Sequence, residues 1–517
     1  MKMLIDLTDQ QRAYLPSNVQ ASRVRADRLQ WLQLTKDLHE SEASFLTLWG
    51  TDDRDQDGGF RIYAAYLLPD TVLIVEHLIA DTSAPSYPSI AASFPAALRM
   101  QRAVCDLLGI STDEIDTRNW LRHGGWPETL FPLRRDVDGS RQYSIVSTPY
   151  PFVAVEGDGV HEISVGPVHA GTIEPGNFRF SVVGEKVLRL EERLGYTHKG
   201  VAKLFETLSQ QSGHRLAARI SGDSAVAFSW AYCAALEAIT ETTCSPRANA
   251  LRALALEHER LANHIGDLGA LGNDAGFAFG LTHFSALKET LLRTNIIAFG
   301  ARYLLDYILP GGVALDLTAD ARCLLLELYD SLQSSVIKMR SIYDNHAGLQ
   351  DRFHEAGQLK QSTAEKLGAI GLIARASGIP CDLRVDHPWH PYNSLAVNII
   401  IQTGGDVAAR VQVRFDEILE SLRLCRVLLA DLPAEDIQTP ILVPSANILG
   451  IGLIEGWRGP VMIALTTDSN GGIRRCHAHD PSWQNWPLID YAILGNIVPD
   501  FPLINKSFNL SYSGHDG

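Results

Sequence analysis

The sequence has no long apolar run and no excess of positive charge. No stretch approaches about 18 uninterrupted apolar residues, and the longest candidate, 441–454, is broken by Pro444, Ser445 and Asn447. We therefore expect no membrane-spanning helix. The N-terminus MKMLIDLTDQ has no apolar segment after its charge, which predicts no signal peptide. The 45 Lys and Arg residues against 60 Asp and Glu leave a net charge of −15, which argues against a nucleic-acid partner and against attraction to anionic lipid.

Paired cysteines are also missing. The seven cysteines stand at positions 105, 233, 244, 323, 381, 425 and 476, and no two of them form a CxxC pair. In a chain without a secretion signal they are expected to be reduced, mostly buried thiols. Their spacing predicts no metal site.

What the chain does contain is a large apolar content with two different patterns. At 517 residues, with 46% hydrophobic and 20% charged residues, it is expected to form two or three domains. Up to about residue 136, short β-type runs at 45–49, 60–67 and 71–78 surround a turn-like DDRDQDGG, and a helical pattern follows at about 94–108. We predict a small α/β domain over residues 1–145.

The second pattern, over residues 150–517, is mainly helical. Strands are predicted at 161–167 and 177–183, paired antiparallel and joined by a connection that contains Pro175 and Gly176. Long Ala- and Leu-rich helices typical of a bundle are predicted at 229–240, 246–271, 283–308 and 406–430. A β-type segment (ILVPSANILGIGLIEG, VMIALTTD) precedes the C-terminus. The predicted fold class is therefore α+β: a small α/β domain, then a mainly helical domain with small β-sheets.

Several motifs resemble known proteins. RMQRAVCDLLGI (99–110) and RHGGWPETLFPLRRD (122–136) resemble the small peripheral C-type subunit of respiratory complex I, which flanks the iron–sulfur subunit. The segments 165–206, 245–274, 367–392, 455–460 and 480–508 resemble, in order, the large subunit of group 4 membrane-associated nickel–iron hydrogenases and the D-type subunit of complex I. The presence of both pieces in one chain resembles the formate hydrogenlyase-type branch.

The resemblance also identifies what is missing from a nickel–iron site. That family holds its metals with four thiolates, from a CGxC pair and a DPCxxC pair, because soft sulfur suits nickel. Here Ser221 and Ser224 stand at the first pair, and Ser511 and Gly514 at the second. A neutral hydroxyl does not replace a nickel-bound thiolate. We expect no metal and no cofactor bound by this chain, no hydrogenase activity, and no trimming of the C-terminus after Gly514; Cys233 is expected to be a core thiol.

The complex I protein of the same fold uses a histidine in the first strand turn and a tyrosine beside the first cysteine position to hold a quinone. Glu174 and Pro175 stand in place of that histidine, and Gly222 in place of the tyrosine. Standard quinone reduction is therefore in doubt, and a quinone bound in a nonstandard way is kept as one candidate acceptor.

Ionisable residues remain at the place where the metals would be. The family resemblance implies a cavity lined by a proton relay made of Glu174, Asp274, His169, Arg219 and Asp223. Buried carboxylates suit this role because burial moves their pKa toward neutrality. The alternative is structural ion pairing, with Arg219 as the fixed partner of one carboxylate, or Arg260 or Arg384 paired with a nearby carboxylate.

The resemblance implies a component of a complex I-like or hydrogenase-like oxidoreductase. Such a protein docks on an iron–sulfur small subunit, lies on the cytoplasmic side of the cell membrane through its partners, and couples electron transfer to proton or ion movement by antiporter-like membrane subunits. The alternatives are a noncatalytic structural subunit, a nonstandard NAD(P)H or quinone oxidoreductase subunit, and a soluble binding protein that reuses the pocket. The electron donor, the acceptor and the ion stay open.

Overall fold

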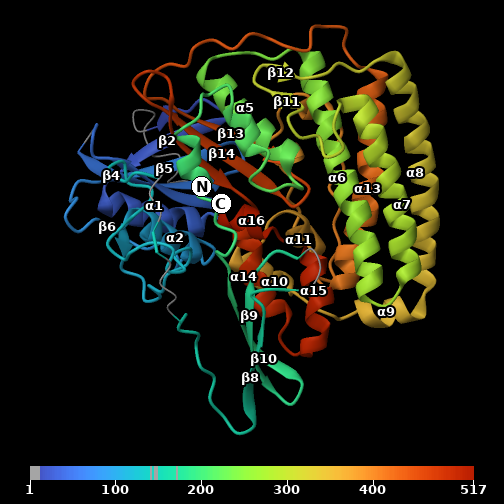
Figure 1. Cartoon of the computed structure of the whole chain (residues 1–517), viewed down its shortest axis with the longest axis horizontal. Coiled ribbons are helices and arrows are strands. Elements are labelled where there is room, and N and C mark those ends of the chain that lie inside the picture. Colours follow the sequence, from blue (N-terminus) through green and yellow to red (C-terminus); the bar gives the residue numbers. More distant parts are fainter. Residues whose placement is uncertain (1–11, 57, 140–142, 145–148, 170–172) are drawn as a thin grey trace.

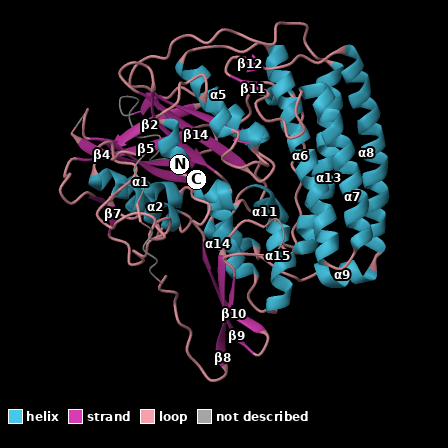
Figure 2. Cartoon of the chain, in the orientation of Figure 1, coloured by secondary structure: helices cyan, strands magenta, loops and turns pink. Residues whose placement is uncertain are grey.

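The computed structural model describes residues 12–56, 58–139, 143–144, 149–169 and 173–517. An N-terminal sheet with its helices lies at one side, a bundle of long helices at the other, and a small sheet and short helices lie between them (Figures 1 and 2). The α+β prediction is confirmed. None of the helices in the described ranges combines the length and the apolar character needed to cross a bilayer.

The N-terminal sheet has the strand order β1-β2-β5-β4-β3, with β2 and β5 parallel and the other neighbours antiparallel. Its elements are β1 (Arg12–Tyr14), β2 (Ala21–Ala26), α1 (Arg28–Glu40), β3 (Ser44–Asp53), β4 (Gly59–Leu67), β5 (Val72–Ile79), β6 (Ser86–Tyr87), α2 (Ala97–Leu108) and β7 (Ser111–Thr112). The three expected strand runs correspond to β3, β4 and β5, and only Thr71 lies outside its strand. The helix expected from 94 begins at Ala97. Pro95 disfavours helical dihedrals in the residue before it, Phe94.

The next sheet projects from the body of the molecule (Figure 1). It contains β8 (Val160–Val165), β9 (Asn177–Val183) and β10 (Lys186–Arg193), all antiparallel. The register sets Val165 opposite Phe178, so the predicted antiparallel pairing is confirmed. Part of the connection, 170–172, lies outside the described residues.

The bundle is built from α6 (Pro246–Asp274), α7 (Ala278–Phe299), α8 (Ala319–Asn345) and α13 (Val407–Ala430). Ser245 caps α6, where its side chain accepts a hydrogen bond from Ala248 N and Pro246 occupies the first turn. The helix expected at 283–308 is wrong at its end: α7 ends at Phe299, because Gly300 adopts a left-handed φ of 80°. Helix α8 lay within the region expected to be mostly helical but was not predicted as an element.

Shorter elements connect the bundle to the rest of the chain. They are α3 (Val201–Phe205), α4 (Gly213–Ala217), α5 (Ala225–Ile239), β11 (Ile308–Leu309), β12 (Gly312–Val313), α9 (Ala347–Phe353), α10 (Gln361–Leu367), α11 (Gly371–Ala376), α12 (Leu383–Asp386), β13 (Leu449–Glu455), β14 (Pro460–Thr467), β15 (Ile473–His479), α14 (Ser482–Ala492), α15 (Phe501–Phe508) and α16 (Tyr512–Asp516), with 3-10 turns at Tyr392–Ser394 and Val498–Asp500. Strand β15 was not predicted.

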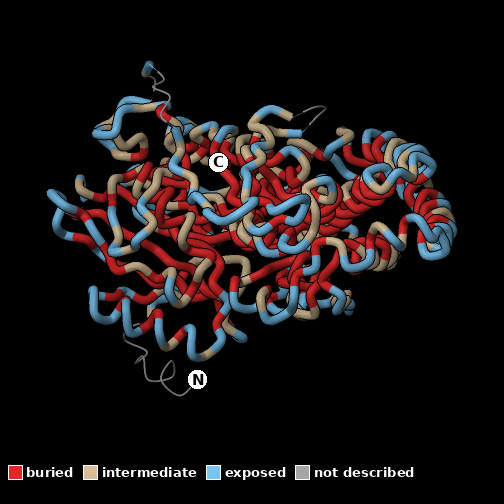
Figure 3. Tube along the Cα trace, turned by 90° about the horizontal axis from the view of Figure 1, so that it is seen from below, coloured by how far each residue is buried: buried red, intermediate tan, exposed pale blue. Residues whose placement is uncertain are grey.

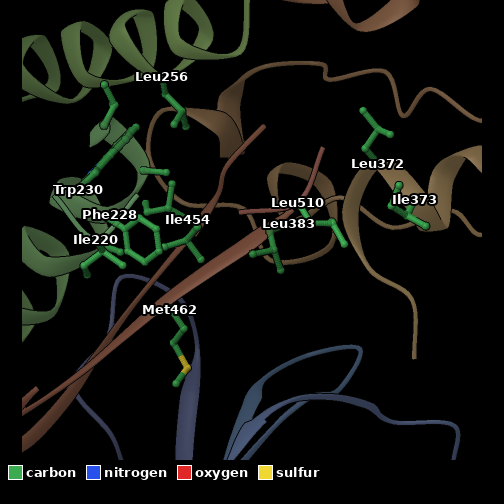
Figure 4. Packing of buried hydrophobic residues seen from close by; sticks show 14 of the residues in the cluster. Ile220, Phe228, Trp230, Leu256, Leu372, Ile373, Leu383, Ile454, Met462 and Leu510 are labelled. Carbon is green, nitrogen blue, oxygen red and sulfur yellow. The ribbon is translucent and has the colours of Figure 1, made fainter. Parts of the chain in front are cut away.

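The two parts of the chain share a core cluster, and the N-terminal part has a second cluster of its own that includes Trp31 and Tyr66. A single cluster of buried hydrophobic residues includes Trp49 and Tyr63 of the N-terminal sheet together with side chains of α5 and β13, and buried backbone runs through the middle of the molecule (Figure 3). Figure 4 shows part of it, with Phe228 and Ile454 among the packed side chains. The strands of the N-terminal sheet lie within residues 12–79, and one isolated β-bridge joins Ser17 to Ile451 of β13 across residue 145. The boundary at 145 stays a prediction.

A glycine in β13 allows α5 to approach the C-terminal sheet. A Cβ added to Gly452 would lie 1.8 Å from Ala231 O of α5. We expect Gly452→Ala to lower the free energy of unfolding by about 1–3 kcal/mol, because the helix must shift to admit the methyl group. Chemical denaturation measures this. Gly125→Ala, where a Cβ meets nothing within 4 Å, is the control, and equal stability of the two variants would contradict the prediction.

Candidate functional site

A cavity of about 480 Å³ lies where the first connection after α4, the end of α6 and the C-terminal helices α15 and α16 meet. Its lining includes Glu174, Ser221, Asp223, Asp274, Arg458 and Ser511. Its volume is in the range of about 300–1,000 Å³ that small-molecule sites occupy. The cavity is named the serine cavity below.

Two serines from opposite ends of the domain meet at its wall. Ser221 lies in the loop before α5, and Ser511 is the residue before α16, whose side chain accepts a hydrogen bond from Gly514 N at 2.8 Å. The Oγ atoms of Ser221 and Ser511 are 2.9 Å apart. The two segments that the family resemblance pairs around a metal therefore converge in this chain.

An ion pair fills the space beside these hydroxyls. Arg458 donates to the two carboxylate oxygens of Asp223 at 2.7 and 2.5 Å, and Ser221 Oγ donates to Asp223 Oδ1 at 2.8 Å. Burial opposes the charged form of Asp223, but Arg458 and the Ser221 hydroxyl outweigh it, so the pKa of Asp223 lies below its ordinary value. Asp223 is thus held as an anion rather than as a proton carrier.

The other two positions at which the resembling family places its thiolates, Ser224 and Gly514, do not line the cavity. Ser224 is buried, with Arg458 Nη1 at 3.3 Å from its Oγ. A Cβ added to Gly514 would lie 2.3 Å from Asp480 Oδ2. With neutral hydroxyls, no thiolate and a guanidinium at this place, the residues present do not fit a nickel–iron centre. Among the described residues, no group of three or more His, Cys, Asp or Glu side chains is arranged to hold a metal ion.

Glu174 and Asp274 both line the serine cavity. Glu174 Oε2 accepts a hydrogen bond from Ser513 N at 3.2 Å. Burial raises the pKa of Asp274 above its ordinary value, and the positive charge of Lys506 and the Asn273 side chain only partly oppose this. The rise at Asp274 comes from burial and not from Glu174, so close coupling between the two carboxylates is not what shifts it. The two residues share a cavity, as predicted, but the expected burial is wrong for Asp274, whose side chain is exposed. Their role in proton transfer stays a prediction.

Two of the five expected residues do not line the serine cavity. Arg219 points away from it and donates to both carboxylate oxygens of Asp306 at 2.7 and 2.9 Å, with 48% of its side chain exposed. The alternative in which Arg219 holds Glu174 or Asp274 is therefore wrong. His169 Nε2 lies 2.8 Å from Gly176 O, so its ring closes the connection between β8 and β9 instead of facing the cavity.

The sequence interpretation missed two cations at the site. Arg458 belongs to the family-like segment EGWRGP (455–460), so the sequence contained a motif that could have pointed to it. Lys506 donates to Asp267 Oδ1 at 3.2 Å and lines the cavity. Lys506 belongs to the family-like segment 480–508, but nothing in the local pattern places it opposite α6.

Glu259 of α6 lies behind the loop. Its carboxylate accepts from Val226 N at 2.6 Å and Ala227 N at 3.2 Å, the free N–H groups at the start of α5. Burial raises its pKa to about 8, against these hydrogen bonds. Asn263 Nδ2 donates to Asp223 O at 2.8 Å, so α6 fixes both sides of this loop.

A buried ion network lies deeper in the same domain. Arg384 Nη1 donates to Glu257 at 3.0 Å, which is the structural pairing that the sequence offered as the alternative for these residues. Arg375 donates to Glu417 at 2.8 Å and to Glu455 at 3.0 Å. Glu257 and its partners are therefore held as ion pairs.

The cysteines lie away from the cavity. Cys233, Cys244, Cys425 and Cys476 are buried, Cys105 and Cys381 are partly buried, and Cys323 is exposed; all seven are free. Cys233 belongs to the hydrophobic core, as predicted.

Comparisons with known proteins follow the same division of the chain. Residues 24–143 match the family described as "Respiratory-chain NADH dehydrogenase, 30 Kd subunit", and residues 274–448 match "Respiratory-chain NADH dehydrogenase, 49 Kd subunit". Formate hydrogenlyase subunit 5 of Escherichia coli (strain K12) is 30% identical over 91% of this chain and 84% of its own length. The fused C/D subunit of the NADH-quinone oxidoreductase of Phocaeicola vulgatus is 27% identical over 83% and 89%.

Among solved structures, a chain of the membrane-bound sulfane sulfur reductase, an archaeal respiratory membrane complex, is similar with a TM-score of 0.65. It is 22% identical and covers 69% of this chain and 99% of its own. At that identity the likeness concerns the fold.

Proposed function

Since the chain belongs to the family of fused complex I-type subunits that includes formate hydrogenlyase subunit 5, we propose that it forms the reaction cavity of a membrane-associated redox complex without a nickel–iron centre. In this proposal the chain docks on an iron–sulfur small subunit, attaches to the cytoplasmic side of the membrane through antiporter-like subunits, and couples electron transfer to proton or ion movement.

The observation that carries the proposal is the serine cavity itself. The contact between Ser221 and Ser511 holds the loop before α5 against the start of α16. An ion pair between Arg458 and Asp223 lies beside these hydroxyls, where a metal centre would need thiolates. A cavity of this size, lined by ionisable groups and without thiolate ligands, suits a small redox carrier. A quinone bound without the usual histidine and tyrosine is one candidate.

The residues of this chain supply protonation and positioning in that proposal. Glu174, in the connection before β9, and Asp274, at the end of α6, both line the cavity. Partial removal from water raises the pKa of Asp274 above that of an ordinary aspartate, although its side chain is exposed at the cavity. A raised pKa brings this carboxylate closer to what proton transfer requires than an ordinary aspartate. Asp223, held as an anion by Arg458, shapes the wall instead.

The proposal is tested on the complex purified through a tag on this chain. We expect an iron–sulfur small subunit and antiporter-like membrane proteins to co-purify, nickel far below one atom per chain, and no hydrogen evolution. Reduced carriers assayed against quinones identify the electron partners. Stoichiometric nickel overturns the metal-free cavity, and purification of the chain alone favours a soluble binding protein.

A noncatalytic structural role is the second candidate. It is favoured by the Arg458–Asp223 pair, in which both carboxylate oxygens already accept hydrogen bonds. It predicts that the complex assembles and turns over at an unchanged rate when cavity carboxylates are substituted. Loss of turnover in assembled variants contradicts it.

A further inference from the structure

A second acidic cluster lies outside the serine cavity, where the N-terminal helix α2 meets β10 and α14. Arg99 of α2 donates through Nη1 to Glu192 Oε1 of β10 and through Nη2 to Asp490 Oδ2 of α14, the latter at 3.3 Å. The Glu192 side chain is fully buried; that of Asp490 is 23% exposed, but its Oδ1 atom is buried. Glu192 Oε2 and Asp490 Oδ1 have no hydrogen-bond partner among the described residues.

The charges of this cluster do not balance. Arg99 is the one guanidinium that contacts both Glu192 and Asp490 in the described structure, so two ionised carboxylates leave one negative charge in a buried place. The neighbouring residues do not supply the missing positive charge. Glu191 is a further acid and is already paired with Arg118 at 2.5 Å. Arg189 is 43% exposed to solvent. Two other titratable groups nearby, Tyr512 and His515, are buried, and neither adds a positive charge: burial raises the pKa of Tyr512 and lowers that of His515. Tyr150 also lies near Arg99.

Low dielectric makes such an excess charge costly, and a proton removes it. Burial raises the pKa of Glu192 to about 7, although Arg99 opposes the rise. Burial, followed by the negative charge of Glu192, raises the pKa of Asp490 well above its ordinary value. Two interacting acids titrate as one unit, so the proton belongs to the pair and not to either residue.

Tyr512 links the serine cavity to the helix that carries Asp490. It lines the cavity, and its ring packs against Trp486 of α14 with the ring centroids 4.8 Å apart, one helical turn before Asp490. Burial first, and then the negative charges of Glu192 and Glu174, raise the pKa of its hydroxyl, which accepts a hydrogen bond from Asn505.

We propose that Glu192 and Asp490 bind one shared proton against Arg99 and exchange it with the serine cavity through Tyr512. Proton binding by the pair is independent of the redox reaction; its use in turnover rests on the proposed function. The competing view is a structural ion pair between the two parts of the chain, in which both carboxylates are permanently ionised.

Infrared spectroscopy of the purified full-length chain at neutral pH distinguishes these views through the carbonyl stretch of protonated carboxylic acids. The shared proton predicts that Glu192→Gln and Asp490→Asn each remove the band of one acid, because the remaining carboxylate then ionises against Arg99. Glu237→Gln is the matched control, since Arg252 holds Glu237 through two hydrogen bonds of 3.0 and 2.6 Å. No band change in either variant overturns the proposal, and so does a loss in one variant alone.

Stability measurements give a second readout that needs no activity. A folded-state pKa raised above the unfolded value gives stability that is present below the unfolded pKa and lost as pH rises through the folded pKa. For Glu192 that interval runs from the ordinary glutamate pKa of 4.5 to about 7. The unfolding equilibrium of the wild type should shift relative to Glu192→Gln by up to about tenfold per pH unit across it. Parallel pH profiles of the two proteins contradict the proposal.

The route is tested by hydrogen–deuterium exchange of the same infrared band. Tyr512→Phe keeps the ring but removes the hydroxyl, and it should leave the band in place while slowing its exchange several-fold. Unchanged exchange rules out Tyr512 as the route. If the assembled complex shows no redox activity at all, the proposed function fails, while the band in the isolated chain still decides the proton-binding pair.

Discussion

Arg375→Met is expected to lower the free energy of unfolding by about 3–5 kcal/mol, because it removes one partner of the buried ion pair with Glu417. Arg375 is 1% exposed and donates to Glu417 at 2.8 Å and to Glu455 at 3.0 Å. Methionine fills most of the space of the arginine stem, so the loss reports the missing charge more than a cavity. Urea denaturation of the full chain, followed by circular dichroism, measures it.

An exposed ion pair is the matched control. Arg293 donates to Glu289 at 2.8 Å on the surface of α7, with 75% of the arginine side chain exposed. Because solvent screens such a pair, Arg293→Met should cost less than about 1 kcal/mol. A loss below about 1 kcal/mol for Arg375→Met as well would mean that water or a proton compensates Glu417 and Glu455, and that the buried network is not a structural element.

Glu174→Gln and Asp274→Asn, each in the assembled complex, are expected to slow coupled turnover by about 10²-fold or more, the range that a lost proton-transfer group costs. Both residues line the serine cavity, and both substitutions keep the size of the side chain. Ion-coupled electron transfer in membrane vesicles, with assembly of the complex checked on the same sample, measures the effect.

Glu185→Gln is the control for this pair. Glu185 is exposed in the turn between β9 and β10, and its loss should leave turnover unchanged. Asp274→Asn should also flatten the pH dependence of turnover on the acid side, because burial places the pKa of Asp274 above its ordinary value. Full turnover in both cavity variants would make these carboxylates structural.

Local patterns predicted most of the elements. The strand runs in β3, β4 and β5 and the long helices α6 and α13 have strong periodicity, which local sequence carries. Strand β15 was missed because its residues RRCHAH are charged and polar. Arg474 in that strand donates to Asp53 of the N-terminal sheet at 3.0 Å, a partner more than 400 positions away that no local pattern contains.

The site was predicted in part, and the division has a physical cause. Glu174, Asp223 and Asp274 line one cavity, as predicted. This was predictable because the order of the motifs indicates which backbone segments converge. Arg219 was wrong because the direction of a long side chain at the end of α4 depends on the nearest anion, Asp306, which only the folded chain brings near.

The sequence by itself determined the chemistry available to this protein. Serine and glycine at 221, 224, 511 and 514 supply no thiolate in any fold, and the order of the motifs assigned both parts of the chain to one family. These are properties of residue identity and of short-range spacing, which the linear chain carries completely.

Only the tertiary structure decided which of these groups meet and how far each is removed from water. It joined Ser221 to Ser511, turned Arg219 outward, and set Arg99 between Glu192 and Asp490. The pKa of a carboxylate depends on burial and on charges a few ångströms away, and both are fixed by contacts between residues that are distant in the chain.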